Sequence, residues 1–303
     1  MKNKFIGIFI EIVLLHLASL FLIWRLSVLS GLGFCIFLVV YLAAMVCIGM
    51  QTYYYIVKPY CREMREMKDA AEESKKAEQI RREFVANVSH ELKTPLTSIS
   101  GFIETLQDGA AEDPEIRTKF IDIIAIETSR LKRLIEDLLV LSDIENKKDS
   151  EFLEFDMRKA IESTVEALKP IADDKDIRIV LKFDENINIK GSADRFRQMM
   201  VNLIENAIKY SDAGSSIWVS AFDEEGKTVV SVKDEGIGIA PEHHERLFER
   251  FYRVDKSRSK KAGGTGLGLS IVKHIAVLFG ATLRVESRIG AGTTFFITFD
   301  RTL

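Results

Sequence analysis

A long stretch without charged side chains near the N-terminus limits what this chain can fold into. No Asp, Glu, Lys or Arg occurs from Leu26 to Val57, and the segment Phe5–Trp24 is almost as apolar. A membrane-spanning helix needs roughly 20 apolar residues. The sequence therefore predicts two transmembrane helices, about Phe5–Trp24 and Gly31–Met50, joined by a very short turn at Arg25–Ser30.

The basic residues around these segments predict their orientation. Two lysines precede the first segment and three basic residues follow the second, whereas the turn holds only Arg25. Because positive residues collect on the cytoplasmic side of a membrane, we expect a multi-pass membrane protein with both termini in the cytoplasm. The alternative for the first segment is a cleaved signal peptide, although Glu11 would be unusual in one.

The remaining composition narrows the functional classes only slightly. The formal net charge of −3 gives no reason to expect nucleic acid as a partner. The predicted turn is too short to form an external binding domain, so a signal would arrive through the membrane, a partner or the cytoplasm. Within the first span, Glu11 and His16 are candidates for contacts with a membrane protein or a second copy of the chain.

The next part of the sequence has the periodicity of long helices. Residues 61–80 are rich in Glu, Lys and Ala and predict a linker helix. Two apolar stripes with helical spacing follow, separated by a stop at Gly109 and a start at Asp113–Pro114. Such a pair forms an antiparallel hairpin. Two helices bury one face poorly, so we expect a four-helix bundle in a homodimer.

Beyond residues 146–150 the pattern changes to alternating helices and strands. Helices are predicted at Met157–Lys169, Ala193–Tyr210 and Leu267–Phe279. The strand-like runs are 177–183, 216–222, 228–234, 282–287 and 293–299. Strands that cluster with hairpin signals predict a mixed sheet covered by helices on one face.

Three motifs in this second part point to a nucleotide site. Asn202 and Asn206 are four residues apart and so share one helical face. The segment "DEGIG" follows a predicted strand, and the segment "GGTGLGLS" opens a helix, whose free N–H groups suit a phosphate. Neither the P-loop nor the dinucleotide-binding pattern fits. Each motif alone is weak, but the three in this order are hard to explain by chance.

With these motifs the chain resembles the sensor histidine kinases, in particular their phosphate-regulon-like branch, from Arg81 to about Phe299. In family terms, the segment "SHELKTPL" is the phosphoacceptor box, headed by His90. Asn202 and Asn206 form the asparagine box. The remaining boxes are the first glycine box at 234–238, the phenylalanine box at 248–251 and the second glycine box at 264–268.

The resemblance implies ATP and Mg²⁺ as cofactors and assigns the residues that hold them. Asn206 would be the Mg²⁺ ligand with Asn202 supporting it, Lys209 would contact phosphate, and Tyr210 would stack near the adenine. Asp234 would accept from the adenine amino group, and Gly236 and Gly238 would let the backbone close on the base. The second glycine box, which would wrap the phosphates, comprises Gly264, Thr265, Gly266, Leu267 and Gly268.

Between the boxes, the basic segment 253–264 suggests a mobile lid over a triphosphate, with Arg253 and Lys256 contacting it. The alternative is a solvated surface loop. Related ATPases of the gyrase and heat-shock type carry a glutamate where Asn202 stands. An amide cannot deprotonate water, so ATP should be held here without efficient hydrolysis.

The nucleophile that the resemblance implies is His90, because a neutral imidazole can attack a phosphorus atom near pH 7. Glu91 would act as general base, and Thr94 would orient water for dephosphorylation of a partner. Pro95 lacks an N–H, so we expect the helix to bend there. Autophosphorylation of His90, transfer to an aspartate of a cytoplasmic response regulator, and phosphatase activity toward that regulator are the implied functions.

The implied architecture has four parts. These are a transmembrane region at 1–57, a cytoplasmic linker helix at 58–80, a dimerisation and histidine phosphotransfer domain at 81–148, and a catalytic domain at 152–303. The last is an α+β sandwich of the histidine kinase, gyrase and heat-shock ATPase type. Residues 58–83 leave no room for a HAMP or PAS module. The alternatives are a protein that works mainly as a phosphatase and a non-catalytic membrane scaffold that binds ATP.

Overall fold

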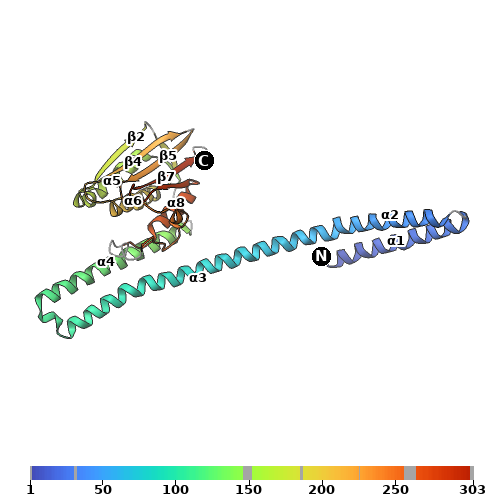
Figure 1. Ribbon diagram of the computed structural model, residues 1–303, viewed down its shortest axis with the longest axis horizontal. Coiled ribbons are helices and arrows are strands. Elements are labelled where there is room, and N and C mark those ends of the chain that lie inside the picture. Colours follow the sequence, from blue (N-terminus) through green and yellow to red (C-terminus); the bar gives the residue numbers. More distant parts are fainter. Residues whose placement is uncertain are drawn as a thin grey trace. The chain divides into compact units, whose positions relative to one another are not determined.

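The computed structural model describes residues 2–30, 33–145, 152–184, 187–224, 226–255 and 264–300. The chain divides into two compact units, Met1–Glu83 and Phe84–Leu303. Helix α3 (Lys58–Gln107) contributes to both units. Each unit is described by itself below (Figure 1).

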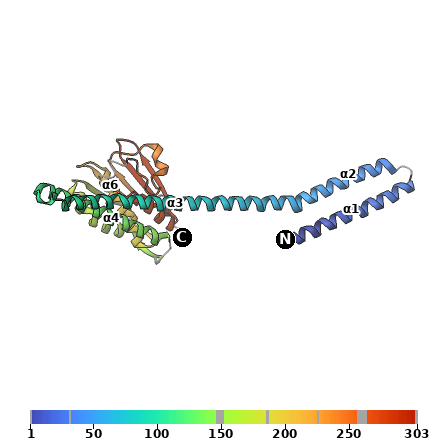
Figure 2. The ribbon, with the colours of Figure 1, turned by 90° about the horizontal axis from the view of Figure 1, so that it is seen from below.

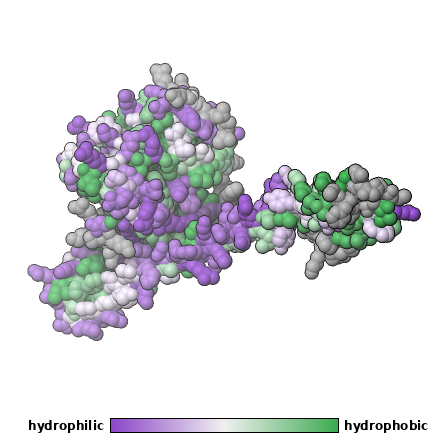
Figure 3. Space-filling view, turned by 45° about the vertical axis from the view of Figure 1, so that its right-hand side comes forward, coloured by the Kyte–Doolittle hydropathy of each residue, from purple (hydrophilic) through white to green (hydrophobic). Residues whose placement is uncertain are grey.

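The first unit is a pair of apolar helices followed by a polar helical segment. Helices α1 (Lys2–Ser30) and α2 (Gly33–Thr52) contact each other, and the rings of His16 and Tyr41 lie 6.0 Å apart. Their described apolar side chains are mostly exposed, as Figure 3 shows. A π-helical turn, η1 (Tyr53–Val57), joins α2 to α3, and the Lys58 N–H donates to the Tyr53 carbonyl oxygen.

The predicted turn between the apolar segments is in the wrong place. Arg25–Ser30 is helical and forms the end of α1. No glycine or proline occurs from Ile8 to Ser30, so the helix continues past the expected end. Among the described residues, one helix is long and apolar enough to cross a membrane, the continuous helical run Leu38–Gln107, and Val13–Leu26 is a shorter apolar stretch. The two-span layout stays a prediction.

The second unit begins with the predicted helical hairpin. Helix α3 continues through the buried Pro95 to Gln107, and α4 (Pro114–Glu145) runs beside it (Figures 1 and 2). Gly109, with a φ of 111°, and the short 3₁₀ helix η2 (Ala110–Glu112) reverse the chain. Asp113 Oδ1 accepts from the N–H groups of Glu115 and Ile116, so it caps α4. The predicted stop and start are confirmed.

The rest of the second unit is the predicted mixed sheet with helices on one face (Figure 1). The strand order is β2-β4-β5-β7-β6, and only the β2–β4 pair is parallel. The strands are β2 (Arg178–Phe183), β4 (Ser216–Glu224), β5 (Lys227–Asp234), β6 (Thr282–Ser287) and β7 (Thr293–Asp300). The covering helices are α5 (Met157–Asp174), α6 (Ala193–Tyr210) and α8 (Gly268–Leu278).

Alternation along the strands explains where the core lies. In β4, Ile217, Val219 and Ala221 are buried and their neighbours less so, because successive side chains of a strand point to opposite faces. These residues pack with Phe196, Met200 and Ile204 of α6 and with Ile271 and Ile275 of α8 in one core. The helices are thereby fixed on the sheet, and the loops at their ends carry the motifs.

Two features of this unit differ from the sequence prediction. Helix α5 continues past Pro170 to Asp174 instead of ending at Lys169. A small second sheet pairs β1 (Leu153–Asp156) with β3 (Asn188–Gly191), neither of which was predicted. The 3₁₀ helix η3 (Pro241–Arg246) lies between the first glycine box and the phenylalanine box.

Candidate functional site

Asp234 ends strand β5 and is almost fully buried, with 6% of its surface exposed. Its Oδ1 accepts from the N–H of Gly236 at 2.8 Å and from the N–H of Thr293 at 3.1 Å. Burial raises the pKa of this carboxyl, and the two backbone donors oppose that rise. No described residue donates to Oδ2, so one carboxylate oxygen is left for a ligand.

The glycines beside Asp234 are needed for close backbone contacts. A Cβ at Gly236 would lie 2.4 Å from the carbonyl oxygen of Tyr210, and one at Gly238 would lie 2.0 Å from that of Arg288. Gly238 also has a φ of +67°, which favours glycine. Gly292 is a third such glycine, which the motifs did not indicate. A Cβ there would lie 2.0 Å from the Asp234 carbonyl oxygen. These contacts hold the segment 234–238 against the end of α6 and the β6–β7 turn.

Helix α6 carries the asparagine box. Ser192 caps its start by accepting from the Arg195 N–H, and Lys175 Nζ caps its end by donating to the carbonyl oxygens of residues 208, 209 and 211. Asn202 is buried, and its Nδ2 donates to the Gln198 carbonyl oxygen. Asn206, one turn further on, is half-buried and has no hydrogen-bond partner among the described residues. An amide oxygen is therefore available for a ligand at Asn206.

Lys209 lies in the last turn of α6, with Nζ 5.1 Å from the Tyr210 ring centroid. Burial, together with the nearby cations Arg253 and Arg133, lowers the pKa of Lys209 to about 8. Burial raises the pKa of Glu205, and the charge of Lys209 opposes that rise. The cations gathered at the end of α6 suit an anionic ligand.

The second glycine box opens α8 and packs against two of the other motifs. A Cβ at Gly268 would lie 2.9 Å from Asn202 Oδ1, so this glycine lets the two helices meet. Gly266 has a φ of +78°, and its carbonyl oxygen accepts from the Phe251 N–H at 2.9 Å. Phe251 itself has a φ of +63°, rare for a bulky residue. Leu267 is buried, whereas Gly264 is half-buried at the edge of the box.

The phosphoacceptor box lies on α3. His90 is exposed, and the Thr94 hydroxyl, also exposed, donates to the His90 carbonyl oxygen at 3.1 Å. Glu91 makes no hydrogen bond to His90. Its Oε2 instead accepts from Arg130 Nη2 of α4 at 2.9 Å and from Arg253 Nη2 at 3.0 Å. The predicted base is therefore held by two guanidinium groups in this conformation.

Two further contacts join the hairpin to the glycine-box region. The Thr265 hydroxyl donates to Asp137 Oδ2 at 2.6 Å, and burial raises the pKa of the Asp137 carboxyl. Arg250 donates to Glu145 and to His274 Nε2. The second glycine box therefore lies against α4 of the hairpin.

The structure thus brings several of the predicted site residues into two groups. One joins Asp234 and Gly236 to Tyr210 at the end of α6. The other contains Glu91, Arg253 and Thr265, and Lys209 lies near enough to Arg253 for its pKa to be lowered by that charge. Lys256, with most of the predicted lid, lies outside the described residues. Sequence reasoning missed Arg130, Asp137, Lys175 and Gly292, because each acts on a residue distant in the sequence.

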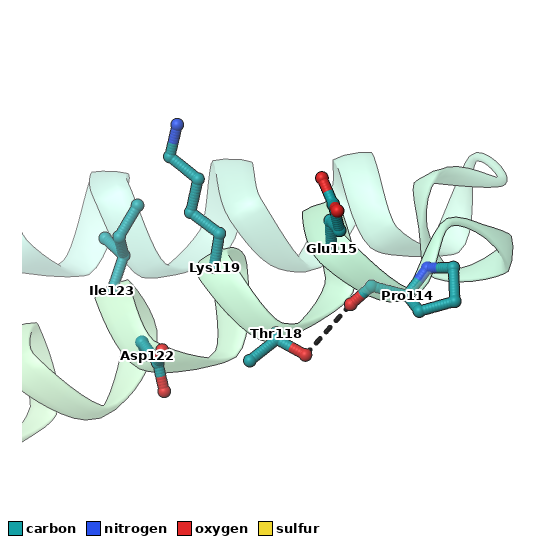
Figure 4. A pocket seen from close by; sticks show the side chains of 6 residues that line it. All are labelled: Pro114, Glu115, Thr118, Lys119, Asp122 and Ile123. Carbon is teal, nitrogen blue, oxygen red and sulfur yellow. Dashed lines mark hydrogen bonds between the residues drawn. The ribbon is translucent and has the colours of Figure 1, made fainter.

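A separate hollow of about 570 Å³ lies on the first turns of α4 (Figure 4). It is lined by Pro114, Glu115, Thr118, Lys119, Asp122 and Ile123. The Thr118 hydroxyl is bonded to the Pro114 carbonyl oxygen, and none of the predicted site residues contributes to the lining. This hollow is therefore no part of the candidate site.

Two family models match the chain. Residues 80–147 match the His Kinase A phospho-acceptor domain, and residues 191–303 match the histidine kinase-, DNA gyrase B- and HSP90-like ATPase. The chain belongs to the sensor histidine kinases. The family predicted from the motifs is confirmed, and ATP is the nucleotide that the second domain type uses.

Named relatives support this family assignment. The sensor histidine kinase WalK of Bacillus subtilis is 39% identical over 229 residues, which are 75% of this chain and 38% of the relative. The sensor-like histidine kinase SenX3 of Mycobacterium tuberculosis is 39% identical over 72% of this chain and 53% of the relative. The chain thus spans between about two fifths and half of the length of these relatives.

A solved structure resembles this chain in fold. Histidine kinase ThkA, in complex with the response regulator protein TrrA, has a TM-score of 0.60 and 28% identity. The match covers 73% of this chain and 61% of ThkA. The arrangement of hairpin and sheet domain is thus found in a kinase bound to its regulator.

Proposed function

We propose that the chain is a membrane-bound, homodimeric kinase that transfers the γ-phosphoryl group of ATP to His90 and then to an aspartate of a response regulator. The observation that carries this proposal is the pair of contacts between the helical hairpin and the nucleotide-site segments. Thr265 of the second glycine box donates to Asp137 of α4, and Arg253 donates to Glu91 of the phosphoacceptor helix α3. A phosphate-binding loop and an exposed histidine within one unit suit transfer between them.

The nucleotide site divides its tasks among the predicted residues. Asp234 Oδ2 accepts from the adenine amino group, Tyr210 stacks beside the base, and Gly236 and Gly238 let the backbone approach it. Lys209, Arg253 and Lys256 contact the phosphates, which the segment 264–268 surrounds. Asn206, supported by Asn202, suits Mg²⁺, since this ion takes one or two protein oxygens beside water and phosphate. Bound Mg²⁺ would neutralise charge on the phosphates.

The transfer step needs little from the protein beyond positioning. One ring nitrogen of His90 forms a bond to the γ-phosphorus while the bond to the bridging β,γ-oxygen breaks and ADP leaves with that electron pair. The other ring nitrogen gives its proton to the Glu91 carboxylate. Asn202 stands where a hydrolase needs a base for water, so the phosphoryl group is kept for His90.

Labelled ATP tests this function directly. The full chain in detergent, incubated with Mg²⁺ and γ-labelled ATP, should gain label that is labile in acid and stable in alkali, as a phosphoramidate is. The label should then move to a response regulator. A chain that binds ATP and gains no label would refute the kinase function and leave the phosphatase and scaffold alternatives.

Raising the pH should weaken ATP binding through Lys209. The pKa of this side chain is lowered to about 8, so its positive charge is lost as the pH rises through that value. Phosphate itself titrates near pH 6 and stays constant above 7.5. Calorimetry between pH 7.5 and 9.5 should show affinity falling for the wild type and little change for Lys209→Arg. Equal pH dependence in both proteins would contradict this role.

Thr94→Ala should reduce phosphatase activity toward the regulator by about 10-fold or more while leaving autophosphorylation intact, because a lost water-positioning group misplaces the nucleophile. The Thr94 hydroxyl is exposed and contacts only the His90 carbonyl oxygen, so the helix tolerates alanine. Release of phosphate from the phosphorylated regulator measures the first activity and labelling of His90 the second. An equal loss of both would contradict the assignment.

A second copy of the chain and a response regulator are the proposed partners. The hairpin leaves several large apolar side chains exposed, among them Leu96, Ile121, Ile126 and Leu139. Pairing two hairpins in a four-helix bundle would bury them. The complex of ThkA with TrrA supports a regulator docked on a kinase of this fold. A monomer at micromolar concentration by light scattering would oppose the homodimer.

The apolar N-terminal unit is proposed to anchor the kinase through α1 and α2 as two spans, with both termini in the cytoplasm. Glu11 and His16 would then face a membrane partner or the other protomer. The exposed Cys61 just beyond the spans provides a test. A membrane-impermeant thiol reagent should label it only from the cytoplasmic side, and labelling from outside intact cells would reverse the topology.

A further inference from the structure

Arg130 of α4 is buried, although arginine side chains are mostly exposed in proteins. Its side chain is 7% exposed, and its Nη2 donates to Glu91 Oε2 at 2.9 Å across the hairpin. On its other side, Nη1 lies 3.7 Å from Glu127 Oε2, one turn earlier on α4. Burying a guanidinium group is costly unless it is paired. Glu91 is the hydrogen-bonded partner of Arg130, and Glu127 adds a charge beside it without a hydrogen bond.

This contact controls which oxygen of Glu91 is available. Both guanidinium groups that reach Glu91, from Arg130 and from Arg253, bind the same oxygen, Oε2. No described residue binds Oε1. A glutamate on an exposed helix would otherwise sample several rotamers. The contacts to Oε2 therefore hold the carboxylate in one orientation and leave Oε1 to take a proton.

Arg130 and Arg253 lie in different parts of the second unit. Arg253 comes from the segment proposed to contact the nucleotide, and its Nη2 also donates to the Thr265 carbonyl oxygen. Arg130 lies on the same hairpin as Glu91, so its contact does not depend on the nucleotide domain. Only Arg130 can orient the carboxylate whatever the nucleotide domain contacts.

We propose that Arg130 is a positioning residue for the phosphoacceptor step, which holds the Glu91 carboxylate so that Oε1 can accept the proton released from the His90 ring. This inference rests on the proposed kinase function. Arg130 does not touch ATP or the reacting atoms and acts through Glu91. Its loss should therefore change the rate of the chemical step and spare the affinity for ATP.

The test is a double-mutant cycle in the full chain in detergent, with initial rates of His90 labelling measured against ATP concentration. Arg130→Gln should lower kcat by about 10- to 100-fold, the cost of a misplaced catalytic group, with the KM for ATP unchanged. Arg130→Lys should recover part of kcat. Arg130→Gln should have almost no further effect in a Glu91→Gln background, because residues that act through one contact are not additive.

Lys132→Gln is the matched control, since Lys132 lies on the same helix and pairs with Glu136 at the surface. Its kcat should equal that of the wild type. An additive cycle, a raised KM for ATP with normal kcat, or full activity of Arg130→Gln would overturn the inference. If Arg130→Gln unfolds at a lower temperature than the other variants, the double-mutant cycle is repeated with Arg130→Lys and Glu91→Gln. Additive effects on kcat in that cycle would likewise overturn the inference. A wild type that gains no label on His90 would refute the proposed function as well, whereas an active wild type with an additive cycle refutes this inference alone.

Discussion

Replacing His90 by glutamine is expected to reduce labelling from γ-labelled ATP to background. Glutamine keeps the size and polarity of the side chain but has no ring nitrogen that can attack phosphorus. The exposed His90 side chain makes no hydrogen bond to another described residue, and the Thr94 hydroxyl bonds only to its backbone oxygen. The substitution should therefore leave the hairpin folded and ATP affinity unchanged. Gel autoradiography and calorimetry measure the two properties.

His244→Gln is the matched control for this variant. His244 lies on η3, and its Nε2 bonds to the Ile239 carbonyl oxygen. Its replacement should leave acid-labile label on the chain. Label retained at the wild-type level in His90→Gln would show that another residue is the acceptor. Loss of ATP affinity in His90→Gln would show instead that the histidine contributes to the nucleotide site.

Local sequence signals were sufficient for the elements that carry the site. The end of β5 at Asp234 and the start of α8 at Gly268 follow from an alternating strand and a glycine-rich helix start, which are properties of short segments. The hairpin follows from two helical stripes and from the Gly109 and Asp113–Pro114 signals. Such features are set by neighbours in the sequence, so one sequence can reveal them.

Contacts between distant residues could not be predicted in the same way. Lys175 caps α6 from more than thirty residues away, and Arg130 reaches Glu91 across 39 residues. The sequence around Lys175 and around Arg130 is like that around an ordinary solvent-exposed charged residue. The Arg25–Ser30 turn failed for the opposite reason. It was placed between two apolar segments of the length that a membrane span needs, but without glycine or proline the backbone stays helical there.

Asp234→Asn is expected to weaken ATP binding by about 100-fold and to change which base the site prefers. In the wild type, Oδ1 accepts from Gly236 and Thr293, and Oδ2 is the oxygen proposed to accept from the adenine amino group. An asparagine can keep its oxygen at the Oδ1 position and so retain both backbone bonds. Its amide nitrogen then faces the adenine amino group, and two opposed donors leave each other unsatisfied in a buried site, at about 1–3 kcal/mol.

Binding of inosine triphosphate is a second test of this prediction, in which the variant should gain relative to ATP. This nucleotide carries a carbonyl oxygen where ATP carries the amino group. The wild type should bind ATP far more tightly than inosine triphosphate, and Asp234→Asn should narrow or reverse that preference. Asp300→Asn is the matched control, since Asp300 ends β7 and pairs with Lys227 at the surface. Unchanged discrimination in Asp234→Asn, with the fold intact by circular dichroism, would contradict the assignment of Asp234 to the adenine.

The pH dependence of ATP binding separates the carboxylate from its amide replacement. Burial raises the pKa of Asp234 above the usual range of an aspartate. Below that pKa the protonated carboxyl donates instead of accepting, so the affinity of the wild type for ATP should fall as the pH is lowered through it. The amide of Asp234→Asn does not titrate, so its affinity for ATP should fall less at low pH than that of the wild type, and the loss that remains comes from the phosphate, which titrates near pH 6. Because Lys209 weakens binding only as the pH rises through about 8, the two groups act on opposite limbs of the profile. Titrations should therefore show a smaller low-pH loss for Asp234→Asn and no high-pH loss for Lys209→Arg.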